Sequence, residues 1–149
     1  MDDGLLEAAK GGHEHLFTFF ITENEIIGGS RIIILGAAWG GHKELAIRHA
    51  GNDAFGVYAG VCGAARGGHK ELIDFFISKG VPNQNWWDSG LVSALWSGRK
   101  DLVDFFIEKG GKLRPEATRG MKQDRVKEVC DYIEKRTIEI STKNKNKKK

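Results

Sequence analysis

Apolar and small residues recur along this chain in blocks of similar design, and each block predicts two short helices joined by a glycine turn. The clearest block runs from Gly63 to Gly80 and reads GAARGGHKELIDFFISKG. Alanines precede its glycine joint, and leucine, isoleucine and phenylalanine follow at helical spacing. Because one such pair cannot bury its apolar face alone, we expect neighbouring copies of the block to bury it for one another.

The block returns at a nearly constant spacing. Aligning the residue that opens each second helix gives five anchors, 29, 27, 30 and 27 residues apart: Leu16, Leu45, Leu72, Leu102 and Val129. Spacing this regular indicates a repeat. We therefore predict one domain over residues 1–136, built from repeats at about 3–24, 32–53, 58–81, 88–111 and 116–136.

Details of the repeats give further predictions. The paired glycines at 11–12, 40–41 and 67–68 suit a left-handed residue that ends each first helix. At least one phenylalanine of the pairs 75–76 and 105–106 should be buried between second helices. The second repeat has Arg48 and His49 in those columns, so its second helix should be about two residues short. Trp86 and Trp87 fall in the loop before the fourth repeat.

The charge of the chain is unevenly distributed. Its 149 residues carry a formal net charge of +3, but five lysines lie within Lys143–Lys149, which leaves 3 − 5 = −2 for the remainder. The body is therefore mildly acidic, and the overall charge does not predict a body that binds nucleic acid. After Ile140 the chain is too polar to pack, and residues 137–149 are assigned to a tail. We expect a basic, disordered tail that contacts nucleic acid at most weakly.

The segments AAKGGHEHL, AAWGGHKEL and AARGGHKEL resemble the helix–turn–helix of ankyrin repeats, whose pattern is Ala-Ala-x-x-Gly-His-x-Glu-Leu/Ile. The glycine joint followed by Lys-Glu-Leu-x-Asp-Phe-Phe is most similar to the short ankyrin-like repeats of large DNA viruses. This resemblance, over roughly residues 3–136, implies an all-α, ankyrin-like helix-turn-helix repeat solenoid of about five short repeats. The family's Thr-Pro-Leu-His start is absent, so we expect short loops rather than β-hairpin fingers between repeats.

The sequence predicts no catalytic or cofactor chemistry. Gly36–Lys43 resembles a phosphate-binding loop, but His42 occupies the lysine position and Glu44 follows where a hydroxyl should hold magnesium. His13, His42 and His69 recur in register, yet equivalent residues of stacked repeats lie roughly 10 Å apart, too far to share a metal ion. Each is expected to bond its own turn. Without a nucleophile–base constellation, we expect no enzyme, no cofactor and no metal.

The cysteines and the apolar runs bear on the compartment. Cys62 and Cys130 match no disulfide or zinc spacing and occupy apolar columns, which predicts buried thiols in a reducing setting. The acidic start is unlike a secretory signal, and no apolar run approaches the ~20 residues of a membrane span. We therefore expect an intracellular, cytoplasmic protein without membrane contact, located in the host cytoplasm or the virion if it is viral.

The column that precedes the glycine joints differs from the core columns. It reads Lys10, Trp39, Arg66, Trp96 and Gln123 down the five repeats. Trp and Arg are enriched at interface hot spots, and the ankyrin resemblance implies that this column borders the concave, partner-facing side. Cation–π stacking between neighbours, Trp39 with Arg66 for example, would explain the same pattern as surface packing alone. Both interpretations stay open.

These features predict a non-catalytic protein–protein interaction module, monomeric and without a small-molecule substrate. A protein partner would bind through the concave face, with Lys10, Trp39, Arg66 and Trp96 as the binding residues. The viral resemblance implies that the partner is a host protein. The alternative is a structural or assembly component of a virus particle, in which the stack contacts copies of itself or a capsid protein. No feature of the sequence separates these two functions.

Overall fold

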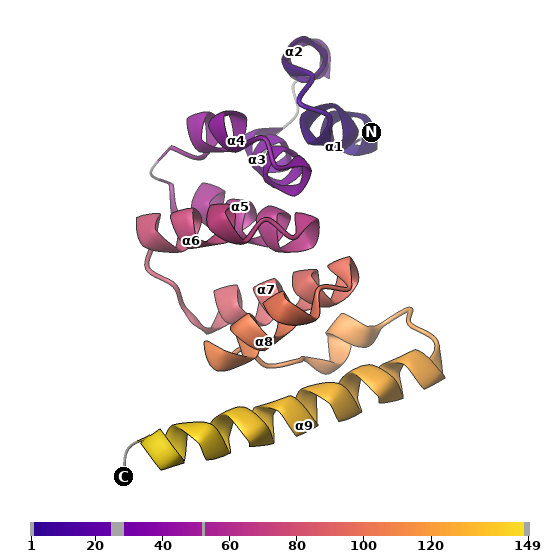
Figure 1. The fold of residues 1–149 in the computed structure, drawn as a ribbon. Coiled ribbons are helices and arrows are strands. Elements are labelled where there is room, and N and C mark those ends of the chain that lie inside the picture. The colour runs from indigo at the N-terminus through magenta and orange to yellow at the C-terminus, as the bar shows by residue number, and fades with distance from the viewer. Residues whose placement is uncertain (1, 25–28, 52, 148–149) are drawn as a thin grey trace.

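The chain forms helix pairs that stack in chain order. The computed structural model describes residues 2–24, 29–51 and 53–147, and within these ranges every regular element is helical, which confirms the all-α prediction. Figure 1 shows the pairs one below another, with a final long helix across the last pair. The pairs are α1 (Asp2–Lys10) with α2 (Glu14–Asn24), α3 (Gly29–Gly40) with α4 (Lys43–Ala50), α5 (Ala54–Gly67) with α6 (Lys70–Lys79), and α7 (Gln84–Ser97) with α8 (Lys100–Glu108). A 3₁₀ turn, η1 (Pro115–Thr118), and α9 (Gln123–Lys147) follow.

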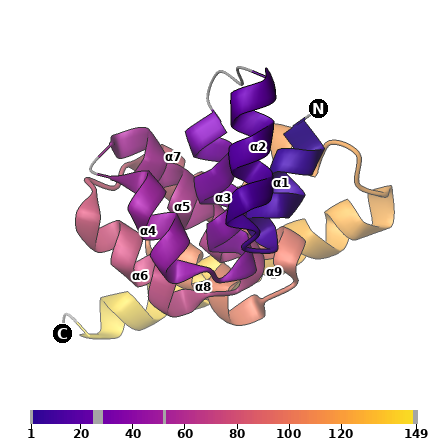
Figure 2. The ribbon, with the colours of Figure 1, turned by 90° about the horizontal axis from the view of Figure 1, so that it is seen from above.

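The first helix of each pair contributes to a continuous spine. α1, α3, α5 and α7 contact one another in sequence, and each second helix packs on the first helix of its own pair (Figure 2). Alanine lines these contacts, and one nearly inaccessible column consists of Ala8, Ala37, Ala64 and Ala94. Small side chains let helix axes approach closely, so the spine is held by contact near the backbone. None of the described helices is both long and apolar enough to cross a membrane.

Glycine brings neighbouring first helices into backbone contact. Gly36 of α3 and Gly63 of α5 occupy the same column of the repeat. A Cβ added at Gly36 would lie 2.8 Å from the carbonyl oxygen of Leu6, and one added at Gly63 would overlap the carbonyl oxygen of Leu35. These positions need glycine because a neighbouring backbone occupies the space of a side chain. α7 has Ser93 in this column, so its approach to α5 leaves room for a Cβ.

Two histidine side chains tie the glycine turns of the second and third helix pairs to the pair before them. His42 Nε2 lies 2.9 Å from the backbone oxygen of Lys10, and His69 Nε2 lies 3.1 Å from that of Trp39. The prediction that the histidines bond their own turns is therefore wrong for His42 and His69. Each ring reaches the last turn of the preceding first helix, where carbonyl oxygens have no partner within their own helix.

The glycine joints and the short second helix follow the sequence predictions. The second glycine of each predicted joint is left-handed, with φ of 73°, 80° and 83° at Gly12, Gly41 and Gly68. α4 has 8 residues where α6 has 10, as the missing phenylalanine pair indicated. His49 instead packs edge-on against Phe17, with ring centroids 5.6 Å apart.

The first helices begin earlier than the predicted repeats. Repeats two, three and four were expected to start at 32, 58 and 88, but their first helices start at residues 29, 54 and 84. Trp86 and Trp87 therefore lie inside α7 and not in a loop. The side chain of Asn83 accepts hydrogen bonds from two backbone amides of the first turn, at 3.0 and 3.3 Å, and so caps α7. The polar residues 83–85, which are typical of a loop, here cap and begin a helix.

The phenylalanine pairs confirm one part of their prediction. Phe76 and Phe106 are almost completely buried, whereas Phe75 and Phe105 are only partly covered. The buried rings lie against the first helix of their own pair, where a Cβ at Gly90 would overlap the Phe106 ring. A glycine of the first helix thus makes room for a large ring of the second helix. The predicted burial of one ring in each pair is confirmed, and its place between second helices stays a prediction.

The fifth repeat and the tail differ from their predictions. Residues 116–136 do not form a helix pair, because the turn η1 replaces the first helix. α9 continues to Lys147, so residues 137–147 are helical and not disordered, while 148–149 lie outside the described residues. Ile133 and Ile140, two helical turns apart, are both 9% exposed and extend the apolar contact past the predicted boundary at 136. Cys130 is exposed because α9 packs on the stack from one side only.

We expect alanine at position 63 to destabilise the fold, although alanine is the better helix former. Gly63→Ala places a methyl group against the Leu35 carbonyl, which should lower the free energy of unfolding by about 1–3 kcal/mol despite a propensity gain of about 1 kcal/mol. Ser93→Ala is the matched control, because α7 already carries a Cβ there; it should change stability by less than about 1 kcal/mol. Urea unfolding measures both. A Gly63→Ala variant as stable as the wild type would contradict the close approach of α3 and α5.

Candidate partner-binding surface

Three residues of the predicted binding column form one continuous stack across three helix pairs. Lys10 ends α1, and Trp39 and Arg66 each lie one residue before the end of α3 and α5. The Lys10 ammonium lies 4.2 Å from the centre of the Trp39 ring, and the Arg66 guanidinium carbon lies 4.3 Å from it. Both distances are within the range of cation–π attraction. The regular stacking of the first helices thus places the column along one line.

The surface-packing interpretation accounts for these three members. Trp39 has a cation from each neighbouring pair at its ring and is only partly exposed, and Lys10 also lies 3.4 Å from the carboxylate of Glu7. The backbone under the stack is fixed as well, since the carbonyl groups of Lys10 and Trp39 bond the histidines described above. Lys10, Trp39 and Arg66 therefore form one edge in which two positive charges flank an indole ring.

Trp96, the fourth member of the column, lies in a different environment. Its side chain is 55% exposed, and no lysine or arginine within the described ranges stacks on its ring. The next residue in the column, Gln123, opens α9 and cannot provide a cation. Trp96 is therefore a large apolar surface left open at the end of a charged, ordered edge.

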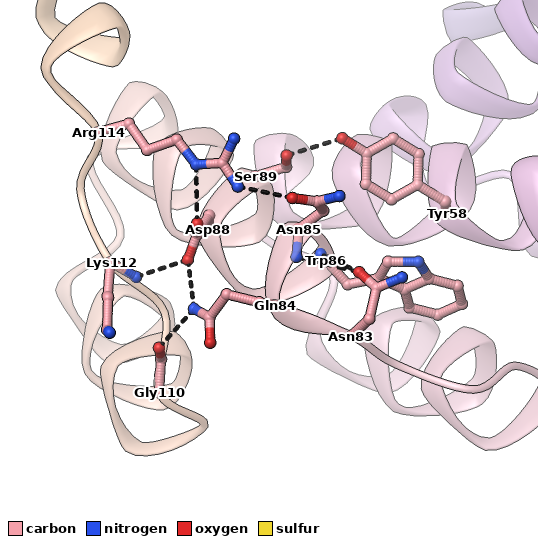
Figure 3. Close-up of polar contacts among 10 residues, drawn as sticks. All are labelled: Tyr58, Asn83, Gln84, Asn85, Trp86, Asp88, Ser89, Gly110, Lys112 and Arg114. Atoms are coloured by element: carbon pink, nitrogen blue, oxygen red, sulfur yellow. Dashed lines mark hydrogen bonds and ion pairs between the residues drawn. The ribbon is translucent and has the colours of Figure 1, made fainter.

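A polar network around Asp88 was not predicted from the sequence. Asp88 lies on α7 and is 6% exposed, and its carboxylate accepts three hydrogen bonds. Gln84 Nε2 donates at 2.6 Å, the backbone amide of Lys112 at 2.8 Å and Arg114 Nε at 2.9 Å (Figure 3). The same Gln84 nitrogen also donates to the carbonyl of Gly110 at 2.8 Å. One buried carboxylate thus holds the segment after α8 against the start of α7.

The network fixes the ionisation of Asp88 and the orientation of Arg114. Burial alone would favour the neutral carboxyl, but the bonds from Gln84, Lys112 and Arg114 outweigh it and keep the pKa of Asp88 below its usual value. Arg114 also donates from Nη2 to Oδ1 of Asn85 at 2.6 Å. Its guanidinium is therefore held from two sides. The signal in the sequence is a single acidic residue directly after the two tryptophans of α7, with an arginine 26 positions later.

A second unpredicted network fastens α9 to α8. Arg136 donates from Nε and Nη2 to the two carboxylate oxygens of Asp104, at 2.8 and 2.7 Å, and also bonds Glu139. Tyr132 donates to the same Asp104 at 3.1 Å. These bonds connect the long helix to the last pair, where few apolar residues of α9 are buried. The network joins α8 to α9, and none of its members belongs to the predicted column.

The described residues contain no group of three histidine, cysteine or acidic side chains placed to hold a metal ion. Cys62 is a poor nucleophile here, because burial raises the pKa of its thiol to about 11 and keeps it protonated at neutral pH. Burial likewise raises the pKa of Tyr58, whose hydroxyl donates to Ser89 Oγ at 2.7 Å. These two groups offer hydrogen bonds and packing rather than acid–base chemistry.

We expect replacement of Asp88 by asparagine to change the dependence of stability on pH. The lowered pKa of Asp88 contributes stability above the unfolded-state value of about 4, and that contribution is lost as the pH falls through the folded-state pKa. Asp88→Asn should therefore lose about 1–3 kcal/mol near pH 7 and less near pH 3, which lies below the unfolded-state pKa. Denaturation at a series of pH values measures this difference. Asp101→Asn, which breaks an exposed pair with Arg99, is the control and should change little. Equal losses at both pH values would contradict the role of the charge.

The chain was compared with known proteins in three ways. No protein-family model, no curated protein and no solved structure matches it. The function must therefore be argued from the residues and contacts described above.

Proposed function

We propose that the chain is a non-catalytic protein-binding module, built as an ankyrin-like array of short repeats. The spacing of 27 to 30 residues, the left-handed glycine joints and the pairs stacked in chain order support this architecture. The partner would contact the column of Lys10, Trp39, Arg66 and Trp96, which runs along the ends of the first helices. If the resemblance to viral repeats is correct, that partner is a host protein.

The exposure of Trp96 carries the proposal. An indole ring left in water forgoes the stabilisation that burial would give, and indole rings are among the residues most enriched at interface hot spots. Trp39 occupies the same column position as Trp96, but its ring is covered within the fold by the cations of Lys10 and Arg66. Trp96 lacks that cover among the described residues, so a partner protein can bury it without breaking an internal contact.

The cations of the column set the chemistry of the partner. Lys10 and Arg66 are fixed against Trp39, and the ordering cost of their side chains is therefore already met before a partner arrives. A partner with an acidic patch opposite these cations and an apolar pocket for Trp96 would match the column. The charges would favour association and orientation, while the buried indole would provide most of the affinity.

We expect Trp96→Ala to abolish partner capture and to leave the fold intact. Loss of a hot-spot anchor should cost roughly 2 kcal/mol or more in binding, whereas a half-exposed side chain contributes little to stability. Trp39→Ala should lower the melting temperature as well, because it removes two internal cation–π contacts. Affinity capture from cells identifies the partner, and titration with the purified partner then measures each variant. Val81→Ala, which alters an exposed loop residue outside the column, is the control. Full binding by folded Trp96→Ala would end the proposal.

A structural role remains the second candidate function, and the N-terminal end of the stack favours it. Leu16 opens the second helix of the first repeat and is 46% exposed. The residues in the same column of the next three repeats, Leu45, Leu72 and Leu102, are at most 8% exposed. The end of the stack therefore leaves open an apolar position that the interior repeats cover, and a second copy of the chain could cover it.

Assembly through this end predicts a change of molecular mass with concentration. Light scattering should show self-association of the wild-type chain, and Leu16→Lys should restore the monomer because it places a charge in the contact. Ile138→Lys, at a 60% exposed position on α9, is the control and should not alter the association. A wild-type chain that stays monomeric at every concentration would exclude this function and would leave the partner-binding module.

A further inference from the structure

An open groove of about 450 Å³ lies between the starts of α5 and α7. It is lined by the side chains of Phe55 and Tyr58 from α5, of Asn85 and Ser89 from α7, and of Arg114 from the segment after α8. The column of Lys10, Trp39, Arg66 and Trp96 lies at the opposite ends of the first helices. Since α5 and α7 each have 14 residues, about 20 Å separates the two surfaces.

Arg114 is held in place as a cation at one end of this groove. Its Nε and Nη2 bond Asp88 and Asn85, while the remaining amino group has no hydrogen-bond partner among the described residues. Figure 3 shows that amino group directed away from both partners. The Arg114 side chain is still 54% exposed. An arginine fixed by a buried carboxylate loses little further conformational freedom when a ligand binds it.

Two of the polar groups next to Arg114, Asn85 and Ser89, can donate hydrogen bonds to a ligand. Figure 3 shows Arg114, Asn85, Ser89 and Tyr58 in a row. Asn85 uses its oxygen to accept from Arg114, so its amide nitrogen points along the row and is available to donate. Ser89 accepts from Tyr58 and retains its own hydroxyl hydrogen. A row of donors selects a ligand rich in acceptors, such as a carboxylate followed by peptide carbonyl groups.

The other side of the groove is aromatic. Phe55 is 59% exposed, and the guanidinium of Arg31 lies 4.5 Å from the centre of its ring. Trp86 lines the groove beneath, close to Tyr58. An apolar or aromatic side chain of a ligand would bury the open part of Phe55. Of the nearby carboxylates, Asp88 is paired with Arg114, and Asp53 accepts a hydrogen bond from the amide of Gly56 at the start of α5.

We propose that this groove binds an extended segment of a partner protein in which an acidic side chain stands beside an apolar or aromatic one. The acid would bind the open amino group of Arg114, the backbone carbonyls would accept from Asn85 and Ser89, and the apolar side chain would pack on Phe55. A phosphoryl group or nucleic acid fits less well, because Arg114 is the single cation among the residues that line the described groove and the neighbouring Arg31 is stacked on the ring of Phe55. The inference rests on the proposed protein-binding function but uses residues that the column does not contain.

The test is a selection of random linear dodecapeptides, displayed on phage, against the full chain. We expect enriched peptides to share an aspartate or glutamate beside an apolar residue. Synthetic copies of these peptides, titrated by fluorescence polarisation, should bind Arg114→Gln about tenfold or more weakly, and Phe55→Ala should weaken binding as well. Arg114→Lys should restore only part of the affinity, since it keeps the charge without the planar fork. Arg99→Gln, which alters an exposed arginine outside the groove, is the control for charge.

The outcomes separate the groove from the column. Peptides that lose affinity in Arg114→Gln and Phe55→Ala but bind Trp96→Ala normally would establish the groove as a separate site. Peptides whose affinity falls in Trp96→Ala but not in Arg114→Gln would contradict the proposal that the groove binds peptides and would support binding at the column. Failure to enrich any peptide, or enrichment of peptides without an acidic residue, would also contradict the proposal that the groove binds an acidic segment. Phe55 is largely exposed, so its alanine variant keeps the test valid even if Arg114→Gln fails to fold.

Discussion

The structure depends on how closely the first helices of successive pairs approach each other. Glycine at positions 36 and 63 lets the backbone of one helix lie against carbonyl groups of the helix before it. That approach brings the ring of His69 within hydrogen-bonding distance of the Trp39 carbonyl, one pair away. It also places Arg66 on the Trp39 ring. The edge that we propose as the binding surface is therefore a direct result of helix spacing.

Sequence reasoning succeeded for features that recur in each repeat. It failed for contacts that no recurring residue pattern marks. The glycine joints, the alanine column and the short α4 follow from local spacing and could be predicted. The start of α7 could not, because Asn83 belongs to a polar run that suits a loop as well as a helix cap. The partner of His69 was missed since the acceptor is a backbone oxygen, and no sequence pattern marks one carbonyl among many.

The candidate sites differ in the same way. The column could be recognised because Trp39 and Trp96 occupy equivalent positions, and repetition makes an unusual residue visible. The network of Asp88 and Arg114 unites residues 26 positions apart, one from a helix and one from an irregular segment. It occurs once in the stack, so periodicity gives no guidance. Likewise, the tail looked too polar to pack, yet Ile140 lies seven residues after Ile133 and extends α9 along the last pair.

The requirement for close packing also decides where binding chemistry can lie on this molecule. In α5 the middle positions carry glycine, alanine and valine, because larger side chains would push the neighbouring helices apart. Large or charged side chains are therefore confined to the two ends of the helix, with Phe55 and Tyr58 at its start and Arg66 near its finish. α7 likewise has one tryptophan near each end, Trp86 near its start and Trp96 near its finish, although Leu91 is buried in its middle. A stack built on small residues thus presents two separate edges rather than one broad face, and a protein partner that spans both would need an extended segment to reach from one edge to the other.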